Sequence, residues 1–177
     1  MLTPKRPDVY VQEESLLPPS AASVSTAIPA FIGHTQTGYN PDADGFPAAM
    51  RITSMLDYKT YFGHAQPLQV KVVSDASNAA LDVIPEEAQT RYTLYHDVDM
   101  YFKNGGGPCY IISCGDYETA PSSAEFINGL TTLAKEDEPT LIVMPEASHL
   151  DINDYGSVIQ QALLQCETLK DLSLIHI

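Results

Sequence analysis

Two segments of opposite character within the first 35 residues constrain the fold more than any other part of the chain. The segment from Ala27 to Gly33 is apolar at almost every position, which is typical of a strand covered on both faces. The segment from Val9 to Glu14 alternates apolar and polar residues and follows Pro4 and Pro7, a pattern that predicts an exposed edge strand. The first segment belongs to a core, and the second lies at its margin.

The chain between these strands, Leu16 to Thr26, offers little surface to bury. Its prolines and small residues favour an extended conformation, so Pro18, Pro19 and Ser20 are predicted to form a tether. A tethered terminal strand can pair with its own sheet or with the open edge of a neighbouring molecule, and the residues alone leave both pairings open. The second pairing would make an inter-subunit arm of Val9, Tyr10, Val11, Gln12, Glu13 and Glu14.

The remaining residues predict an α/β fold, a sheet with buried parallel strands and helical crossovers, preceded by the extended arm strand. Apolar residues at helical spacing predict helices over 54–62, 91–103, 123–135 and 154–169. Buried strands are predicted at Cys109–Cys114 and Thr140–Met144, and an exposed strand at Leu68–Val73. Alternation of strand and helix implies right-handed connections between parallel strands. The polar stretch from Ser74 to Thr90 receives no assignment.

A glycine-rich loop separates the second predicted helix from the strand that follows it. Loops that bind phosphate follow a strand and open a helix, whereas this loop follows a helix and opens a strand. A helix C-terminus also presents carbonyl groups, which repel anions. The sequence therefore predicts a structural turn in which at least one glycine has a positive φ, made by Asn104, Gly105, Gly106 and Gly107.

Composition excludes several classes of function. The chain has 177 residues with 23 acidic and 9 basic side chains, a formal charge of −14, and nucleic-acid binding requires a surplus of Lys and Arg. No apolar run approaches the roughly 20 residues that span a bilayer, so we expect no membrane insertion. The first residues lack the apolar stretch of a secretory signal, and we expect a soluble protein made in the cytosol.

No grouping of residues in the sequence indicates catalysis, a cofactor or a metal. The five histidines lie far apart, at His34, His64, His96, His149 and His176. Cys109 and Cys114 are five residues apart on one strand and point to opposite faces, so with Cys166 they are expected to be free thiols. Glu146 follows a buried strand, where open α/β sheets place their sites, but the sequence brings no partner to it.

Three separated motifs resemble one known family. They are the run from Pro7 to Gly33 with its Pro-Pro-Ser tether, the segment Ile52–Gly63, and the run Phe102–Ser113 that contains the glycine turn. Together they resemble contractile tail sheath proteins, the subunits of the outer contractile cylinder of tailed phages and phage-tail-like injection systems. The resemblance extends to about Asp171 and implies that the chain is an N-terminal portion of a sheath protein, with an arm at 1–26 and an incomplete α/β domain at 27–177.

The resemblance implies a structural subunit with no enzymatic activity and no cofactor. Its expected partners are other sheath subunits and the inner tail tube, in a virion tail or phage-tail-like particle assembled in the bacterial cytoplasm. Contraction of the sheath would drive the tube through a membrane. The alternative is a flavodoxin-like or other doubly wound α/β enzyme domain, which would use the carboxyl edge of its sheet.

Overall fold

A computed structural model describes most of the α/β region of the chain. The described residues are 27–38, 49–67, 70–74, 80–85, 92–118, 120–170 and 172–175. The predicted arm, Val9 to Glu14, and the tether at Pro18, Pro19 and Ser20 lie outside the described residues. None of the helices in the described ranges is long and apolar enough to cross a membrane.

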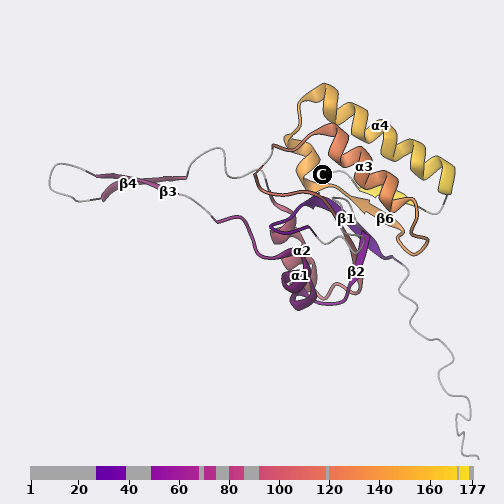
Figure 1. The fold of residues 1–177 in the computed structure, drawn as a ribbon, viewed down its shortest axis with the longest axis horizontal. Coiled ribbons are helices and arrows are strands. Elements are labelled where there is room, and N and C mark those ends of the chain that lie inside the picture. Colours follow the sequence, from indigo (N-terminus) through magenta and orange to yellow (C-terminus); the bar gives the residue numbers. More distant parts are fainter. Residues whose placement is uncertain are drawn as a thin grey trace, which may run out of the picture.

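A five-stranded mixed sheet forms the centre of the molecule (Figure 1). Its strand order is β2-β5-β1-β6-β7, with β1 at Pro29–His34, β2 at Ala49–Ile52, β5 at Cys109–Gly115, β6 at Leu141–Val143 and β7 at Ser173–Ile175. Strands β5, β1, β6 and β7 are parallel, and β2 pairs antiparallel with β5 at one edge. The predicted α/β class with buried parallel strands is confirmed.

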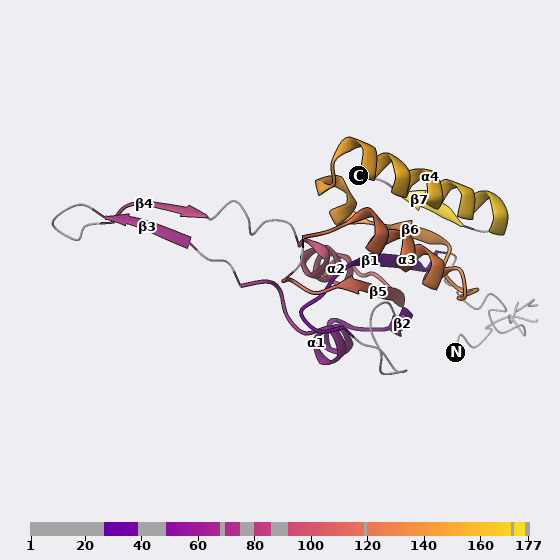
Figure 2. The ribbon, with the colours of Figure 1, turned by 45° about the horizontal axis from the view of Figure 1, so that its top comes forward.

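Two pairs of helices cover the two faces of this sheet (Figure 2). Helices α3, Ser123–Leu133, and α4, Ile152–Leu169, cover one face, while α1, Met55–Phe62, and α2, Leu94–Lys103, cover the other. A short 3-10 helix, η2 at Pro145–His149, connects β6 to α4. The chain therefore makes three layers, with the sheet in the middle.

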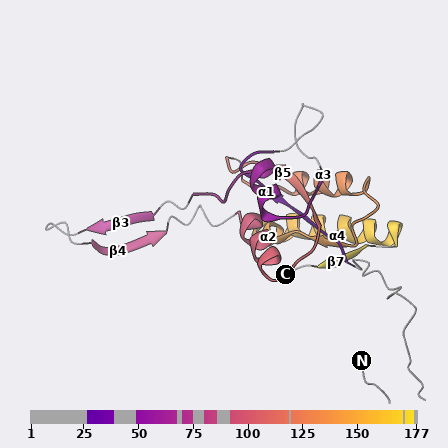
Figure 3. The same ribbon diagram turned by 90° about the horizontal axis from the view of Figure 1, so that it is seen from below.

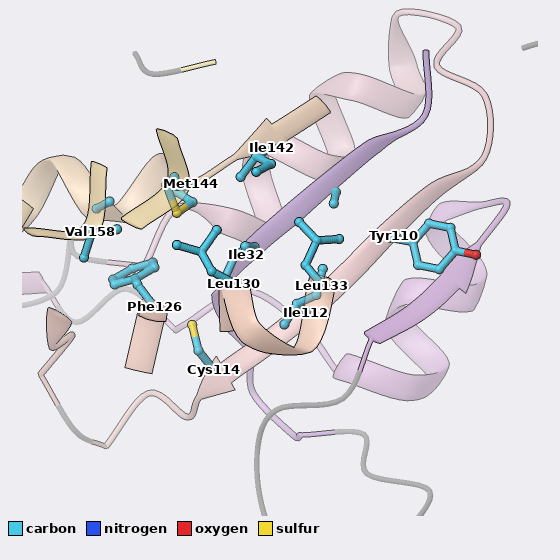
Figure 4. Packing of buried hydrophobic residues seen from close by; sticks show 13 residues of the cluster. Ile32, Tyr110, Ile112, Cys114, Phe126, Leu130, Leu133, Ile142, Met144 and Val158 are labelled. Carbon is cyan, nitrogen blue, oxygen red and sulfur yellow. The ribbon is translucent and has the colours of Figure 1, made fainter. Parts of the chain in front are cut away.

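The side chains of β1 point alternately to the two faces of the sheet, and helices cover both faces, which explains why its sequence is almost entirely apolar. All six of its residues are buried, with Ala30 and Ile32 facing the α3–α4 side and Phe31 facing the α1–α2 side. Figure 4 shows Ile32 among Phe126, Leu130 and other residues of the first cluster. A strand between two helical layers has no solvent face, so polar alternation is absent from it.

The boundaries of several elements differ from the sequence expectation. β1 begins at Pro29 and not at Ala27, and it continues through His34. α2 begins three residues later than predicted, after Thr93, and α4 begins two residues earlier, because the Asp151 side chain accepts hydrogen bonds from the N–H groups of Asn153 and Asp154. Such caps define the first turn more strongly than the apolar spacing does.

Two further differences concern the surface. The apolar side predicted for α1 is only partly buried, since Tyr58 and Phe62 are in the core whereas Leu56 is 73% exposed. Residues 70–74 and 80–85 form an antiparallel hairpin, β3 at Val70–Ser74 and β4 at Ala80–Pro85, where the sequence had predicted only the first strand. This hairpin stands away from the five-stranded sheet and its helices (Figure 3).

The glycine turn ends α2 by a Schellman arrangement. The N–H of Gly105 donates to the carbonyl of Phe102 at 3.1 Å, and the N–H of Gly106 donates to that of Tyr101 at 2.9 Å. Gly105 has a φ of 85°, a conformation that favours glycine. At Gly106 a side chain would meet the Tyr101 ring at 2.5 Å, so this position needs its glycine for a different reason.

Alanine substitutions in this turn should distinguish the roles of its three glycines in stability. Gly105→Ala strains the backbone, and Gly106→Ala drives a methyl group into the Tyr101 ring, so each should lower the free energy of unfolding by about 1 to 2 kcal/mol. Gly107→Ala is the matched control, because a methyl group there meets nothing within 4 Å and no positive φ is involved. Urea denaturation measures all three. Equal loss of stability in Gly107→Ala would contradict the assignment.

Candidate functional site

The carboxyl ends of β1 and β6 mark the place where a doubly wound sheet would bind a ligand. Among the parallel strands, β5 is the next after β1 along the chain and lies on one side of it in the sheet. β6 comes after β5 and lies on the other side of β1, so the direction of strand addition reverses between β1 and β6. In open α/β sheets, ligands bind in the crevice outside such a switch point. In this protein the position is occupied by two of its own side chains, His34 at the end of β1 and Glu146 in η2.

The carboxylate of Glu146 is fully buried and accepts three hydrogen bonds. Its Oε2 accepts from the backbone N–H of His34 and from the His34 ring nitrogen Nδ1, both at 2.8 Å. Its Oε1 accepts from the backbone N–H of Leu94 at 3.1 Å. Leu94 is the first residue of α2, so the carboxylate also lies at the positive end of that helix dipole. A buried carboxylate is stable only when surrounded by donors in this way.

The His34 ring connects Glu146 to a second acidic side chain. Its Nε2 lies 3.5 Å from Oε2 of Glu125, and the ring itself is fully buried. The same Glu125 oxygen accepts hydrogen bonds from the backbone N–H and hydroxyl of Ser122, the capping box that opens α3. The cluster of His34, Glu125 and Glu146 therefore ties β1, η2, α2 and α3 together.

The charges around His34 determine its protonation. Burial by itself lowers the pKa of the imidazole, but the hydrogen bond to Glu146 and the negative charges of Glu146 and Glu125 outweigh it, so the pKa lies above its ordinary value of 6.5. The aromatic rings of Tyr92 and Phe126 lie 5.4 Å and 5.9 Å from the imidazole and complete its surroundings. The ring therefore stays protonated to a higher pH than a histidine in water.

Two glycines leave room for the cluster. A side chain at Gly33 would lie 3.1 Å from Oε2 of Glu146, and one at Gly115 would lie 2.7 Å from Cδ2 of His34. Neither position can take a larger residue without moving the buried pair. Backbone from β1 and β5 therefore closes on the His34 and Glu146 side chains.

This arrangement suits a structural clamp. His34 and Glu146 have no exposed surface on which a substrate would react. Cys114, the buried thiol on the neighbouring strand, has a pKa raised well above its ordinary value by burial and nearby carboxylates, which disfavours the nucleophilic thiolate. Among the described residues, no three His, Cys, Asp or Glu side chains are placed to hold a metal ion.

The cluster combines residues that the sequence treated separately. Glu146 was singled out because it follows a buried strand, and the structure places it in the core. His34 was one of five scattered histidines, and its pairing with a residue 112 positions away had no local signal. Parallel strands bring their carboxyl ends to one edge, so polar residues that end two buried strands were the available indication. The glycine turn at 104–107 lies at the end of α2 and is not part of the cluster.

Glu146→Gln should test the clamp. The amide keeps the size of the side chain but removes the charge and turns an NH₂ group toward one set of donors, so the free energy of unfolding should fall by about 3 kcal/mol. Asp137→Asn is the control: this carboxylate is exposed, and its neutralisation should change stability by less than about 0.5 kcal/mol. Chemical denaturation of both variants measures the difference. A Glu146→Gln protein as stable as the parent would show that the clamp is dispensable.

The raised pKa of His34 predicts a pH dependence of stability. The unfolded chain releases this proton near pH 6.5, and the folded chain releases it at a higher pH. Between these two values the folded state binds more protons, so the free energy of unfolding is greatest below this window and falls as the pH rises through it. Thermal denaturation across the window should show this slope.

Two histidine variants test whether His34 causes this pH dependence of stability. His34→Gln should remove the slope and lower stability, whereas His64→Gln, at an exposed position, should retain it. A slope that survives in His34→Gln would mean that another group is responsible.

Comparison with known proteins defines what this fold resembles. No protein-family model matches the sequence, and no curated protein matches it. The structure is similar to a chain of the anti-feeding prophage helical sheath in its contracted state, with a TM-score of 0.54 and 22% identity over 96% of this chain and 39% of that chain. It is also similar to a chain of the anti-feeding prophage baseplate in its contracted state, with a TM-score of 0.51 and 19% identity. That second similarity covers 92% of this chain and 37% of the other. The chain thus spans about two fifths of the length of these solved chains.

Proposed function

We propose that this chain, whose fold is that of contractile sheath proteins, is part of a structural subunit of a contractile tail sheath. The observation that carries the proposal is the similarity to a helical sheath chain over 96% of the residues. The three sequence motifs at Pro7–Gly33, Ile52–Gly63 and Phe102–Ser113 resemble the same family.

The buried cluster favours this function over a doubly wound enzyme. An enzyme of that class keeps the switch point open for its ligand and uses helix N-termini there to bind anions. Here the N-terminus of α2 receives the carboxylate of Glu146, and the His34 ring fills the adjoining space. A ligand would have to displace a buried charged pair, which argues for a non-enzymatic subunit without a cofactor.

The proposed partners follow from the assemblies in which the similar chains occur. Those chains belong to the helical sheath and the baseplate of the anti-feeding prophage. We infer that this subunit assembles with copies of itself around an inner tail tube, in a phage tail or phage-tail-like particle put together in the bacterial cytoplasm. Its net charge of −14 disfavours a nucleic-acid partner. Contraction of the assembly would drive the tube through a membrane.

The predicted arm offers a physical basis for contacts between subunits. In the proposed division, residues 1–26 form an arm and 27–177 the α/β domain. The strand Val9–Glu14 adds to a sheet of an adjacent subunit, where main-chain hydrogen bonds supply affinity and Val9 and Val11 fill shallow pockets. The tether from Leu16 to Thr26 reaches about 35 Å when extended, at roughly 3.3 Å per residue. Subunits joined in this way can change their packing without separating, and they rebind at a high effective concentration.

Removal of the arm tests both the function and the mechanism. Electron microscopy of the full-length subunit, of which this chain is proposed to be a part, should show tubes. Deletion of residues 1–15 from it should leave a folded protein that forms no stable sheath, because each subunit loses its link to a neighbour. Circular dichroism checks folding. Discrete particles with catalytic turnover in the undeleted product would favour the enzyme alternative.

Point variants of the arm supply the matched control. Replacing Val9 and Val11 with Asp should abolish tubes as the deletion does, since both side chains lie on the face that enters the partner. Gln12→Ser, on the opposite face, should assemble normally. Normal tubes from the double variant, or unfolding of the deleted protein, would show that the arm serves its own domain.

A further inference from the structure

The carboxylate of Glu125 connects two elements through a single oxygen atom. Its Oε2 accepts hydrogen bonds from the backbone N–H of Ser122 at 2.9 Å and from the Ser122 hydroxyl at 2.8 Å, at the start of α3. The same atom lies 3.5 Å from Nε2 of His34, which belongs to β1. The contacts that cap the first turn of α3 and the surroundings of the imidazole therefore depend on one oxygen.

The two carboxylates beside His34 differ in their freedom to move. The side chain of Glu146 has no exposed surface, and three nitrogen donors hold its two oxygens. The side chain of Glu125 is 28% exposed, so water can replace a partner that it loses. When the charge between the two carboxylates changes, Glu125 is therefore the one that is able to turn away.

The proton of His34 decides whether Nε2 attracts or repels Glu125. At 3.5 Å the contact is an ion pair, and Nε2 has no hydrogen-bond partner among the described residues. The neutral ring keeps its hydrogen on Nδ1, because Oε2 of Glu146 accepts from that atom at 2.8 Å. Nε2 then turns a lone pair toward Glu125, whose ionised oxygens also only accept. Loss of the proton therefore replaces an attraction with a repulsion.

The other titratable side chains near this cluster keep their protons when His34 loses its own. Burial lowers the pKa of the imidazole, and the hydrogen bond and charge of Glu146 and the charge of Glu125 raise it above its ordinary value. Burial raises the pKa of three further groups that lie near the carboxylates, so they remain neutral: Cys114 of β5, Tyr117 after β5 and Tyr58 of α1. The segment before α2 contributes the Tyr92 ring, 5.4 Å from the imidazole.

We propose that His34 and Glu125 form a proton-controlled latch on the start of α3. With the proton in place, the imidazole holds the Glu125 carboxylate against Ser122. When the proton leaves, Glu125 turns toward water and Ser122 loses its acceptor, while Glu146 and its donors stay in place. The latch is closed at lower pH and opens as the pH rises. It opens one end of a helix in a folded domain, and it does so whether or not the chain assembles into a sheath.

A nuclear magnetic resonance titration of the 177-residue chain tests the latch in solution. The His34 ring proton on Cε1 reports protonation, and the Ser122 amide proton reports the hydrogen bond to Glu125. As the pH rises above 6.5, the two signals should titrate with one midpoint, and the Ser122 amide should move upfield because it loses its acceptor. Crystal structures at a pH below 6.5 and at a pH above the midpoint should show two orientations of the Glu125 side chain.

Glu125→Gln should uncouple the two signals. The amide oxygen still accepts from Ser122, but the charge that the imidazole attracts is gone, so the Ser122 amide should stop titrating. The His34 midpoint should fall by about one pH unit, because one of two neighbouring negative charges is lost. Glu167→Gln is the matched control, since it makes the same change of charge at an exposed position near the end of α4, and both signals should behave as in the parent.

Three results would overturn the latch. They are a Ser122 amide that stays unchanged while His34 titrates, a Ser122 titration that survives in Glu125→Gln, and unfolding of the domain before His34 loses its proton. The first and third are measured on the parent chain, so they decide the matter even if Glu125→Gln fails to fold. A common midpoint in the parent, together with its loss in Glu125→Gln and its retention in Glu167→Gln, would support the latch.

Discussion

The buried carboxylate of Glu146 is the interaction on which the arrangement of the layers depends. A charge inside a protein is tolerated only when donors replace the water that it has lost. Three nitrogen donors do so here, from the backbone of His34, the ring of His34 and the backbone of Leu94. These donors set the positions of β1 and α2 relative to η2. If either element shifted, the buried carboxylate would lose hydrogen-bond donors.

This clamp connects the two sides of the sheet. Glu146 reaches the start of α2 on one side, and the His34 ring reaches Glu125 at the start of α3 on the other. The two apolar clusters, which share no buried residue, are therefore joined by a polar link at the carboxyl ends of the strands. Apolar packing is non-directional, whereas the hydrogen bonds at this edge hold β1 and the start of α2 to Glu146 in a defined geometry.

In the proposed function, such rigidity would let the α/β domain move as a body while the tether accommodates the rearrangement. The buried side chains of His34 and Glu146 fill the position at which a doubly wound sheet binds its ligand. The same fold can thus serve assembly when its ligand position is filled from within.

By itself the sequence determined the α/β class, the burial of β1 and the turn at Gly105, because each depends on local pattern: apolar run length, helical spacing and the need for a positive φ. A local sequence pattern does not show which residues far apart in the chain come into contact in the fold. The pairing of His34 with Glu146 and the extra edge strand β2 were decided by tertiary structure, where partners far apart in sequence compete with intrinsic preference. A buried ion pair is defined by two remote residues at once, and neither residue alone carries a sign of the other.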